Sequence, residues 1–163
     1  MATIMTKSEL VMKIITKLTD DLKVLFTAAT AAHEASIHEE NIPDNKYDTL
    51  ALEASYVAQG QANRAQEIRQ SIEIYKNLRL LQSNDQIIRL TSLVTVETDN
   101  GMQKIVFIGP AEGGLKIIEN TLEIMVITPA SPLGRELLGK SIGDNLEILA
   151  GTYRSNYEII KIS

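Results

Sequence analysis

The sequence predicts an α+β protein in which a long antiparallel helical hairpin precedes a small antiparallel sheet domain with one short helix. Three observations support this fold class. Apolar residues recur at spacings of three and four over two long stretches, a proline lies in the short bend between them, and from about residue 86 the apolar period changes to two. We therefore expect two domains, with bounds of 1–82 for the hairpin and 86–163 for the sheet domain.

The first long stretch, residues 8–38, contains neither glycine nor proline. Its regularly spaced apolar residues are Val11, Ile14, Leu18, Leu25, Ala32 and Ala35. The proline of Ile42-Pro43-Asp44 ends this helix, because a proline ring disfavours the helical conformation at the residue before it. A second periodic run extends from near Asp44 to near Leu81, and Gly60 within it should cost about 1 kcal/mol.

Two helices of similar length that are joined by a short bend lie antiparallel and bury their apolar stripes against each other. The predicted seam is rich in alanine near the bend. These alanines are Ala28, Ala29, Ala32 and Ala35 on the first helix and Ala51, Ala54, Ala58 and Ala62 on the second. Small side chains let two backbones approach closely, so this end is either a narrow probe or simply a sequence of high helix propensity.

The C-terminal half carries strand and turn patterns. TSLVTVET and MQKIVFIG predict two strands joined by a tight turn at Asp99-Asn100-Gly101. LKII, TLEIMVIT, NLEIL and TYRSNYEIIKIS predict the remaining strands. Residues 131–139 suit a short helix, with Pro132 at its first position and Gly139 closing it.

The composition excludes several functional classes. The net charge of −5 disfavours a general nucleic-acid binder, which normally has a basic surface. The absence of cysteine excludes disulfides, thiolate catalysis and cysteine-ligated zinc. No stretch approaches the roughly 20 apolar residues of a membrane span, and lysines interrupt the apolar runs at the N-terminus. We expect a cytoplasmic monomer with no membrane partner.

Acidic residues gather around the bend. Between Glu34 and Glu53 there are six of them against a single lysine. If the second helix begins near Asp44, then Asp44 and Asp48 are one turn apart on the same face. They can serve as an N-cap and as a partner of the helix dipole. They can equally offer two carboxylates to magnesium, which is typically held by one or two carboxylates together with waters and ligands from another molecule.

Other candidate sites are weaker. His33 and His38 are five residues apart, whereas a zincin helix needs two histidines four apart on one face. The glycines form no phosphate-binding or dinucleotide-binding motif. The sequence also gives no basis for assigning a Ser-His-Asp catalytic triad. The stretch from Ser131 to Arg135 can be a helix start with its cap or an exposed docking knob.

The run ITPASPLGRELLGKSIGDNLEIL, residues 127–149, resembles the C-terminal sequence of the GreA/GreB family of bacterial transcript cleavage factors. The residues that carry the resemblance are Ser131, Pro132, Leu133, Leu138, Gly139, Lys140, Gly143 and Asp144. The chain length and the order, a helical hairpin before a small sheet domain, also agree with this family.

The resemblance implies a C-terminal domain with an FKBP-like fold that docks at the rim of the secondary channel of RNA polymerase. The residues it places at that contact are Ser131, Pro132, Leu133 and Gly134. The helical hairpin would enter the channel, so that its acidic tip reaches the polymerase active site. RNA polymerase is therefore the expected partner.

The resemblance also implies a role for the tip. Asp44 and Asp48 would help polymerase to hold its second catalytic magnesium and to orient a water, so that polymerase cleaves the 3′ segment of a backtracked RNA. The magnesium belongs to the polymerase active site, and the free protein is expected to bind none. The protein is then an accessory factor and not an enzyme. Arg64 and Arg69, on the mildly basic stem, are candidates for contact with the nascent RNA.

The tip departs from the family pattern, which is roughly Asp-Leu-basic-Glu-Asn-x-Glu-Tyr with the two acids three apart. The stretch Asp44-Asn45-Lys46-Tyr47-Asp48 instead places two aspartates four apart. The leading expectation is a factor that stimulates cleavage, and the alternative is a non-catalytic regulator that occupies the channel on the same scaffold. Peptidyl-prolyl isomerase activity follows from fold analogy alone, and Phe107, Tyr153 and Tyr157 are too few to favour its aromatic-lined pocket.

Overall fold

The structure is a computed structural model of the whole chain, and it describes residues 5–40, 45–80 and 86–163. Within the two long helices, some side chains lie outside this description: those of residues 29, 32, 33, 35–40 and 45–55. The chain divides into two compact units, Ile14–Lys76 and the combination of Met1–Lys13 with Asn77–Ser163.

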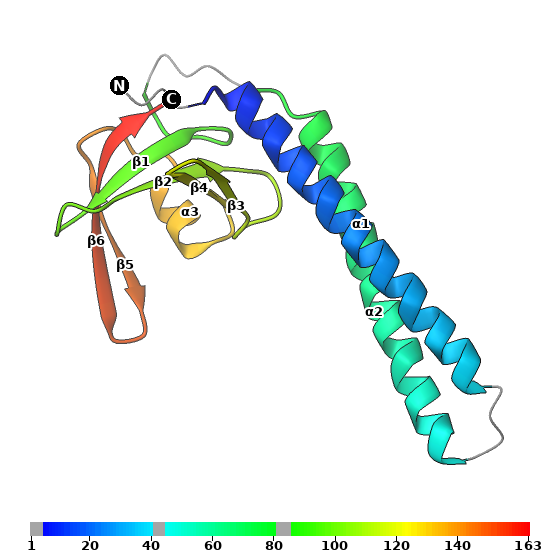
Figure 1. Cartoon of the computed structure of the whole chain (residues 1–163). Helices are drawn as coiled ribbons and strands as arrows, with labels where there is room; N and C mark the ends of the chain where they lie inside the picture. Colours follow the sequence, from blue (N-terminus) through cyan, green and yellow to red (C-terminus); the bar gives the residue numbers. More distant parts are fainter. Residues whose placement is uncertain (1–4, 41–44, 81–85) are drawn as a thin grey trace. The chain divides into compact units, whose positions relative to one another are not determined.

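The first unit is the helical hairpin, formed by α2 (Asn45–Lys76) and by α1 (Lys7–Glu40) from Ile14 onward (Figure 1). A capping box starts α1, because the Glu9 N–H donates to Thr6 Oγ1 at 3.1 Å and the Thr6 N–H donates to Glu9 Oε2 at 3.3 Å. The predicted hairpin is confirmed, and the start of α2 lies one residue from the predicted one.

The seam of the hairpin follows a heptad pattern on α2. The seam positions are Ala58, Gln61, Ala65, Ile68, Ile72 and Tyr75, at alternating spacings of three and four. All except Gln61 are buried. Among the described side chains of α1 in this unit, Ile14 and Leu18 are buried.

Two predictions about α2 were wrong. Ala62 is exposed, because the heptad phase places Ala65 and not Ala62 in the seam. The helix also ends at Lys76, earlier than the predicted Leu81. Asn77 has a low helix propensity, and the residues that follow it belong to the sheet unit, where Leu78 and Leu80 are half-buried.

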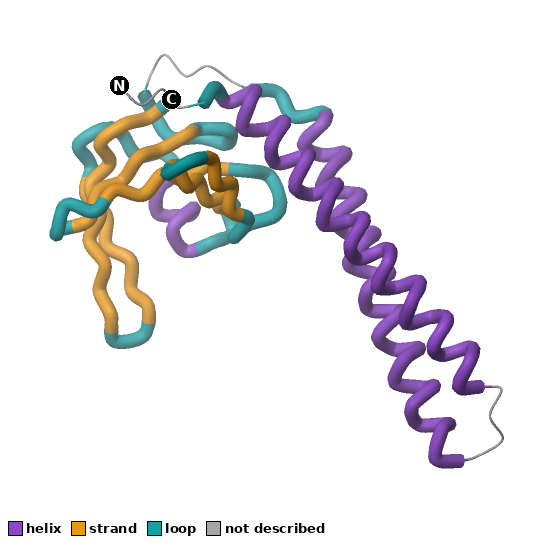
Figure 2. The backbone as a smooth tube through the Cα atoms, viewed as in Figure 1, coloured by secondary structure: helices purple, strands orange, loops and turns teal. Residues whose placement is uncertain are grey.

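The second unit contains a six-stranded sheet in the order β3-β4-β2-β1-β6-β5 (Figure 2). The strands are β1 (Leu93–Thr98), β2 (Gln103–Ile108), β3 (Lys116–Glu119), β4 (Leu122–Ile127), β5 (Asn145–Ala150) and β6 (Tyr153–Ile162). The predicted tight turn between the first two strands is confirmed. Gly101 has φ +82° there, and its N–H donates to Thr98 O at 2.9 Å.

The prediction of an antiparallel sheet was wrong for one strand pair. β2 and β4 pair in parallel, with Val106 opposite Met125, whereas the other four pairings are antiparallel. The chain between β2 and β4 contains β3, which pairs with the outer side of β4. This crossover returns β4 to the sheet in the direction of β2, so the sheet is mixed.

The core of the sheet unit lies between the sheet and the helix α3 (Pro132–Leu137). Its buried residues are Ile88, Val94, Val96, Val106, Ile108, Ile127, Leu137, Leu146 and Ile159. Leu137 is the member of this cluster that α3 contributes, so the core holds the short helix against the sheet. Within the described part of the chain, no helix has the length and apolar character needed to cross a membrane.

Candidate functional site

The first turn of α3 is locked by Ser131. The backbone of Ser131 is extended, with φ −73° and ψ 154°, and its Oγ accepts a hydrogen bond from the Gly134 N–H at 3.0 Å. The same hydroxyl donates to Thr128 O at 2.8 Å. Pro132 follows as the first helical residue, where its missing N–H leaves nothing unsatisfied. The predicted helix start and cap are therefore confirmed.

Gly134 is buried beneath this turn. A Cβ at Gly134 would lie 2.0 Å from Thr128 O and 2.9 Å from Ser131 Oγ. The helix backbone thus packs directly against the carbonyl of residue 128, and no side chain fits between them. Gly134 therefore shapes the turn, and its predicted contact with polymerase stays a prediction.

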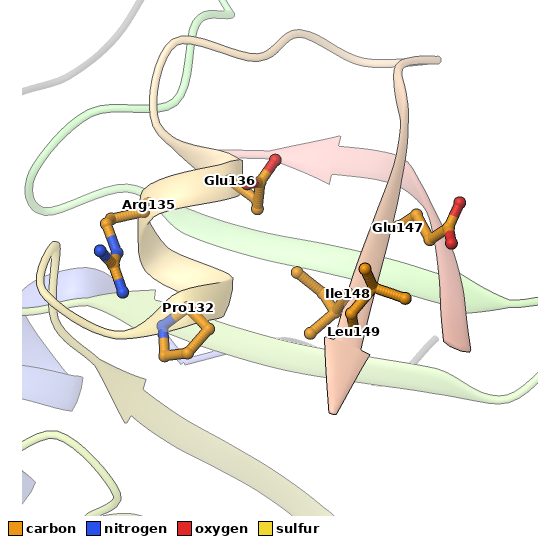
Figure 3. Close-up of a pocket in the computed structure, with 6 residues that line it drawn as sticks. All are labelled: Pro132, Arg135, Glu136, Glu147, Ile148 and Leu149. Carbon is orange, nitrogen blue, oxygen red and sulfur yellow. The ribbon is translucent and has the colours of Figure 1, made fainter. Parts of the chain in front are cut away.

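An open groove of about 320 Å³ lies beside α3. Its lining residues are Pro132, Arg135 and Glu136 from α3 and Glu147, Ile148 and Leu149 from β5. Figure 3 shows Pro132 on one side and the two apolar β5 residues on the other. Leu149 is 64% exposed although it is apolar, and Pro132 is also exposed. An apolar floor with charged residues at its edges is typical of a small protein-docking surface.

The four predicted docking residues differ in what they can offer a partner. Pro132 is exposed, Ser131 is half-buried and engaged in the cap, and Leu133 is half-buried against the core. Their contact with polymerase stays a prediction. The β5 side of the groove was missed by the sequence reasoning. The available signal was Leu149, which breaks the apolar–polar alternation of NLEIL.

The acidic tip lies largely outside the described residues. Asp44 is not described, and Asp48 lies within α2 with its side chain outside the description, as are the side chains of His33 and His38. Among the side chains that the structure does describe, no three His, Asp or Glu residues form a group that could hold a metal ion. The magnesium-sharing role of the two aspartates therefore stays a prediction.

The two arginines predicted to contact RNA have different surroundings. The Arg64 guanidinium pairs with the Glu67 carboxylate at 3.1 Å on the same helix. Arg69 is exposed and lines a second open groove of about 320 Å³, together with Leu22, Lys23, Phe26 and Thr27 of α1.

This second groove is lined by one aromatic residue and two cationic residues. Phe26 is 58% exposed within the groove. Among the described side chains, neither Lys23 nor Arg69 forms an ion pair with a carboxylate. An exposed ring and two cations without an ion pair in one groove suit the base and phosphate of a single-stranded nucleic acid.

Comparison with known proteins decides the family. The sequence profile described as "Transcription elongation factor, GreA/GreB, C-term" matches residues 82–163, which is half of the chain. The chain belongs to the GreA/GreB family. The match covers the whole of β1 to β6 together with α3 and the groove beside it.

Individual relatives are distant. Transcription elongation factor GreA of Flavobacterium johnsoniae is 29% identical over 121 residues, which cover 70% of this chain and 72% of that protein. The solved structure of Thermus aquaticus Gfh1 is 25% identical, with a TM-score of 0.40 over 90% of this chain and 92% of its own. A GreA/GreB factor of Nitrosomonas europaea is 14% identical, with a TM-score of 0.38 over 81% of this chain and 91% of its own.

Membership of the Gre family has two consequences. Gre factors are accessory proteins of RNA polymerase and not enzymes themselves, so RNA polymerase is the partner that the family implies. The profile match begins at residue 82, so it does not include the helical hairpin or its tip. The family profile therefore supports the C-terminal half directly.

Proposed function

We propose that this Gre factor docks on RNA polymerase through the surface around α3 and regulates transcription by occupying the secondary channel, without stimulating transcript cleavage. The observation that carries the proposal is the combination of a family-matched docking domain with a tip that departs from the family pattern. Asp44 and Asp48 are four positions apart instead of three, and the second acid is an aspartate where the family has glutamate.

The chemistry of a shared magnesium explains why this departure matters. Carboxylate oxygens are the ligands that magnesium prefers, so the donor types fit. Magnesium demands near-octahedral geometry at about 2.0–2.1 Å, so a carboxylate with a shorter reach and a different direction does not replace the family pair. In the polymerase site such an ion activates the attacking water or stabilises the leaving oxygen. On this proposal, Asp44 and Asp48 act mainly as the cap and first-turn acid that the sequence predicts for the second helix.

The test uses purified polymerase in two assays. With stalled, backtracked complexes that carry a 3′-labelled RNA, we expect no release of a 3′ fragment beyond the polymerase-only control. In promoter-dependent initiation and single-nucleotide addition, we expect a change in rate. The variant with Asp44→Ala and Asp48→Ala should keep that rate change and melt at a lower temperature, because alanine cannot cap the helix. A released 3′ fragment that disappears with this double variant would overturn the proposal.

Cleavage stimulation is the second candidate, and the retained pair of aspartates favours it. The pair lies in a stretch with six acidic residues, so another acid near the bend can contribute a ligand. This candidate predicts that the fragment appears, that the double variant abolishes it, and that Glu53→Gln weakens it. The same backtracked complexes therefore decide between the two functions.

We also propose that the groove on the hairpin contacts the nascent RNA through Lys23, Phe26 and Arg69. The base would stack on Phe26 while the two cations approach the phosphates. Arg69→Gln should weaken RNA crosslinking to the hairpin in the polymerase complex and reduce its salt dependence. Arg64→Gln is the matched control, because Glu67 already neutralises that side chain. Equal losses in the two variants would contradict this assignment.

A further inference from the structure

The hairpin consists of two segments that differ in how they are packed. The stem segment comprises residues 14–22 and 65–76, and the distal segment, nearer the bend, comprises residues 23–34 and 56–64. The stem segment buries large apolar side chains, namely Ile14, Leu18, Ile68, Ile72 and Tyr75. In the distal segment, Ala58 is the only described side chain that is buried. Alanine removes far less apolar area from water than isoleucine or leucine, so the distal segment has the weaker hydrophobic seam.

A polar residue weakens this part of the seam further. Gln61 occupies a heptad position between Ala58 and Ala65, and its Oε1 is buried without a hydrogen-bond partner among the described atoms. A buried acceptor that loses its hydrogen bond to water destabilises the closed seam. The neighbouring Gly60 lowers helix stability in the same turn, with no close packing around it to compensate.

The large apolar residues of the distal segment do not strengthen the seam. Val24, Phe26, Tyr56 and Val57 are each more than half exposed.

From these four features we infer that the distal segment opens and closes as a separate local unit while the stem segment stays folded. We further infer that polymerase binds the closed form, so that binding orders the distal segment. This second step rests on the proposed function. Local units of low stability are common in elements that bind a partner. A protein whose competent form is only partly populated binds with an affinity reduced by that fraction, so closing the seam in advance should tighten binding.

Amide hydrogen exchange of the full-length protein tests the first step. We expect amides of the distal segment to exchange at least about tenfold faster than those of the stem segment, corrected for intrinsic rates. The double variant Gly60→Ala with Gln61→Leu should slow distal exchange by about tenfold or more and leave the stem unchanged. Gln66→Leu is the matched control, since Gln66 is exposed on the same helix and its replacement should change neither segment. Equal protection of both segments in the parent protein would overturn the inference.

Binding to polymerase tests the second step. The distal amides should gain protection when polymerase is added, and the double variant should bind more tightly than the parent while Gln66→Leu binds equally. If the distal segment opens separately but the double variant binds no more tightly, the coupling to polymerase is overturned. If neither protein binds polymerase at all, the proposed function fails, and the exchange experiment still decides the local opening on its own.

Discussion

Replacing Gly134 with alanine should unfold the α3 turn, although the change adds a single methyl group. Gly134 is buried, and the new Cβ would lie 2.0 Å from Thr128 O. That oxygen belongs to the backbone, so it cannot rotate away as a flexible side chain would. Either α3 or the segment before it must shift, and the Ser131 cap bond of 3.0 Å is then lost.

The expected magnitude follows from three contributions. Overpacking of this kind typically costs about 1–3 kcal/mol, and loss of the N-cap adds about 1 kcal/mol. The higher helix propensity of alanine returns up to about 1 kcal/mol. We therefore expect the sheet unit to lose about 1–4 kcal/mol of stability, a change of roughly fivefold to thousandfold in an unfolding equilibrium.

Amide exchange from β1 measures this loss, because β1 is a central strand whose amides open only when the sheet unit unfolds. Gly134→Ala should accelerate exchange of those amides by the factor above, and Ser131→Ala by about tenfold, which isolates the cap. Gly60→Ala is the negative control. A Cβ added at Gly60 meets no atom within 4 Å, so exchange of the β1 amides should not change. A Gly134→Ala protein with β1 exchange within about threefold of the parent would refute the reasoning from steric overlap.

Three further predictions concern other parts of the chain. Gln61→Leu should stabilise the hairpin by about 1–3 kcal/mol, because it removes a buried oxygen that has no hydrogen-bond partner among the described atoms. The melting temperature measured by far-ultraviolet circular dichroism should therefore rise. An unchanged melting curve would contradict this reason. Pro132→Ala should weaken polymerase binding while leaving β1 exchange unchanged; a parallel change in exchange would assign Pro132 a structural role only. Burial lowers the pKa of Lys7 from 10.5, so its charged form is disfavoured in the folded protein. Stability should therefore rise with pH between the folded pKa and 10.5, since the unfolded chain then binds more protons, and Lys7→Gln should lose this slope in urea titrations.

The sequence predicted the structure correctly where the structure depends on the conformational preferences of neighbouring residues. The period of three and four predicted α1 and α2, and Asn100-Gly101 predicted a turn that needs a positive φ. Ser131 followed by Pro132 predicted the start of α3 because cap and proline preferences act within one turn. The same run of residues also pointed to the correct family.

These local patterns did not predict the contacts between residues that are distant in the sequence. The parallel pairing of β2 with β4 depends on the path of the crossover through β3, and no strand pattern encodes pairing direction. That Ala62 lies outside the seam depends on the phase of the whole heptad run, which alanine alone does not reveal. The β5 wall of the groove beside α3 was missed because it comes together only when the sheet is assembled.

The sequence by itself determined the elements, the order of the two parts and the family, because helix period, turn chemistry and capping are local properties of the chain. The tertiary structure alone decided that Gly134 packs against the carbonyl of Thr128 and that Pro132 is exposed at the start of α3. It also decided that Gln61 Oε1 is buried without a hydrogen-bond partner among the described atoms. Each of these depends on which atoms from elsewhere in the chain surround the residue, and burial and steric overlap exist only once the chain has packed.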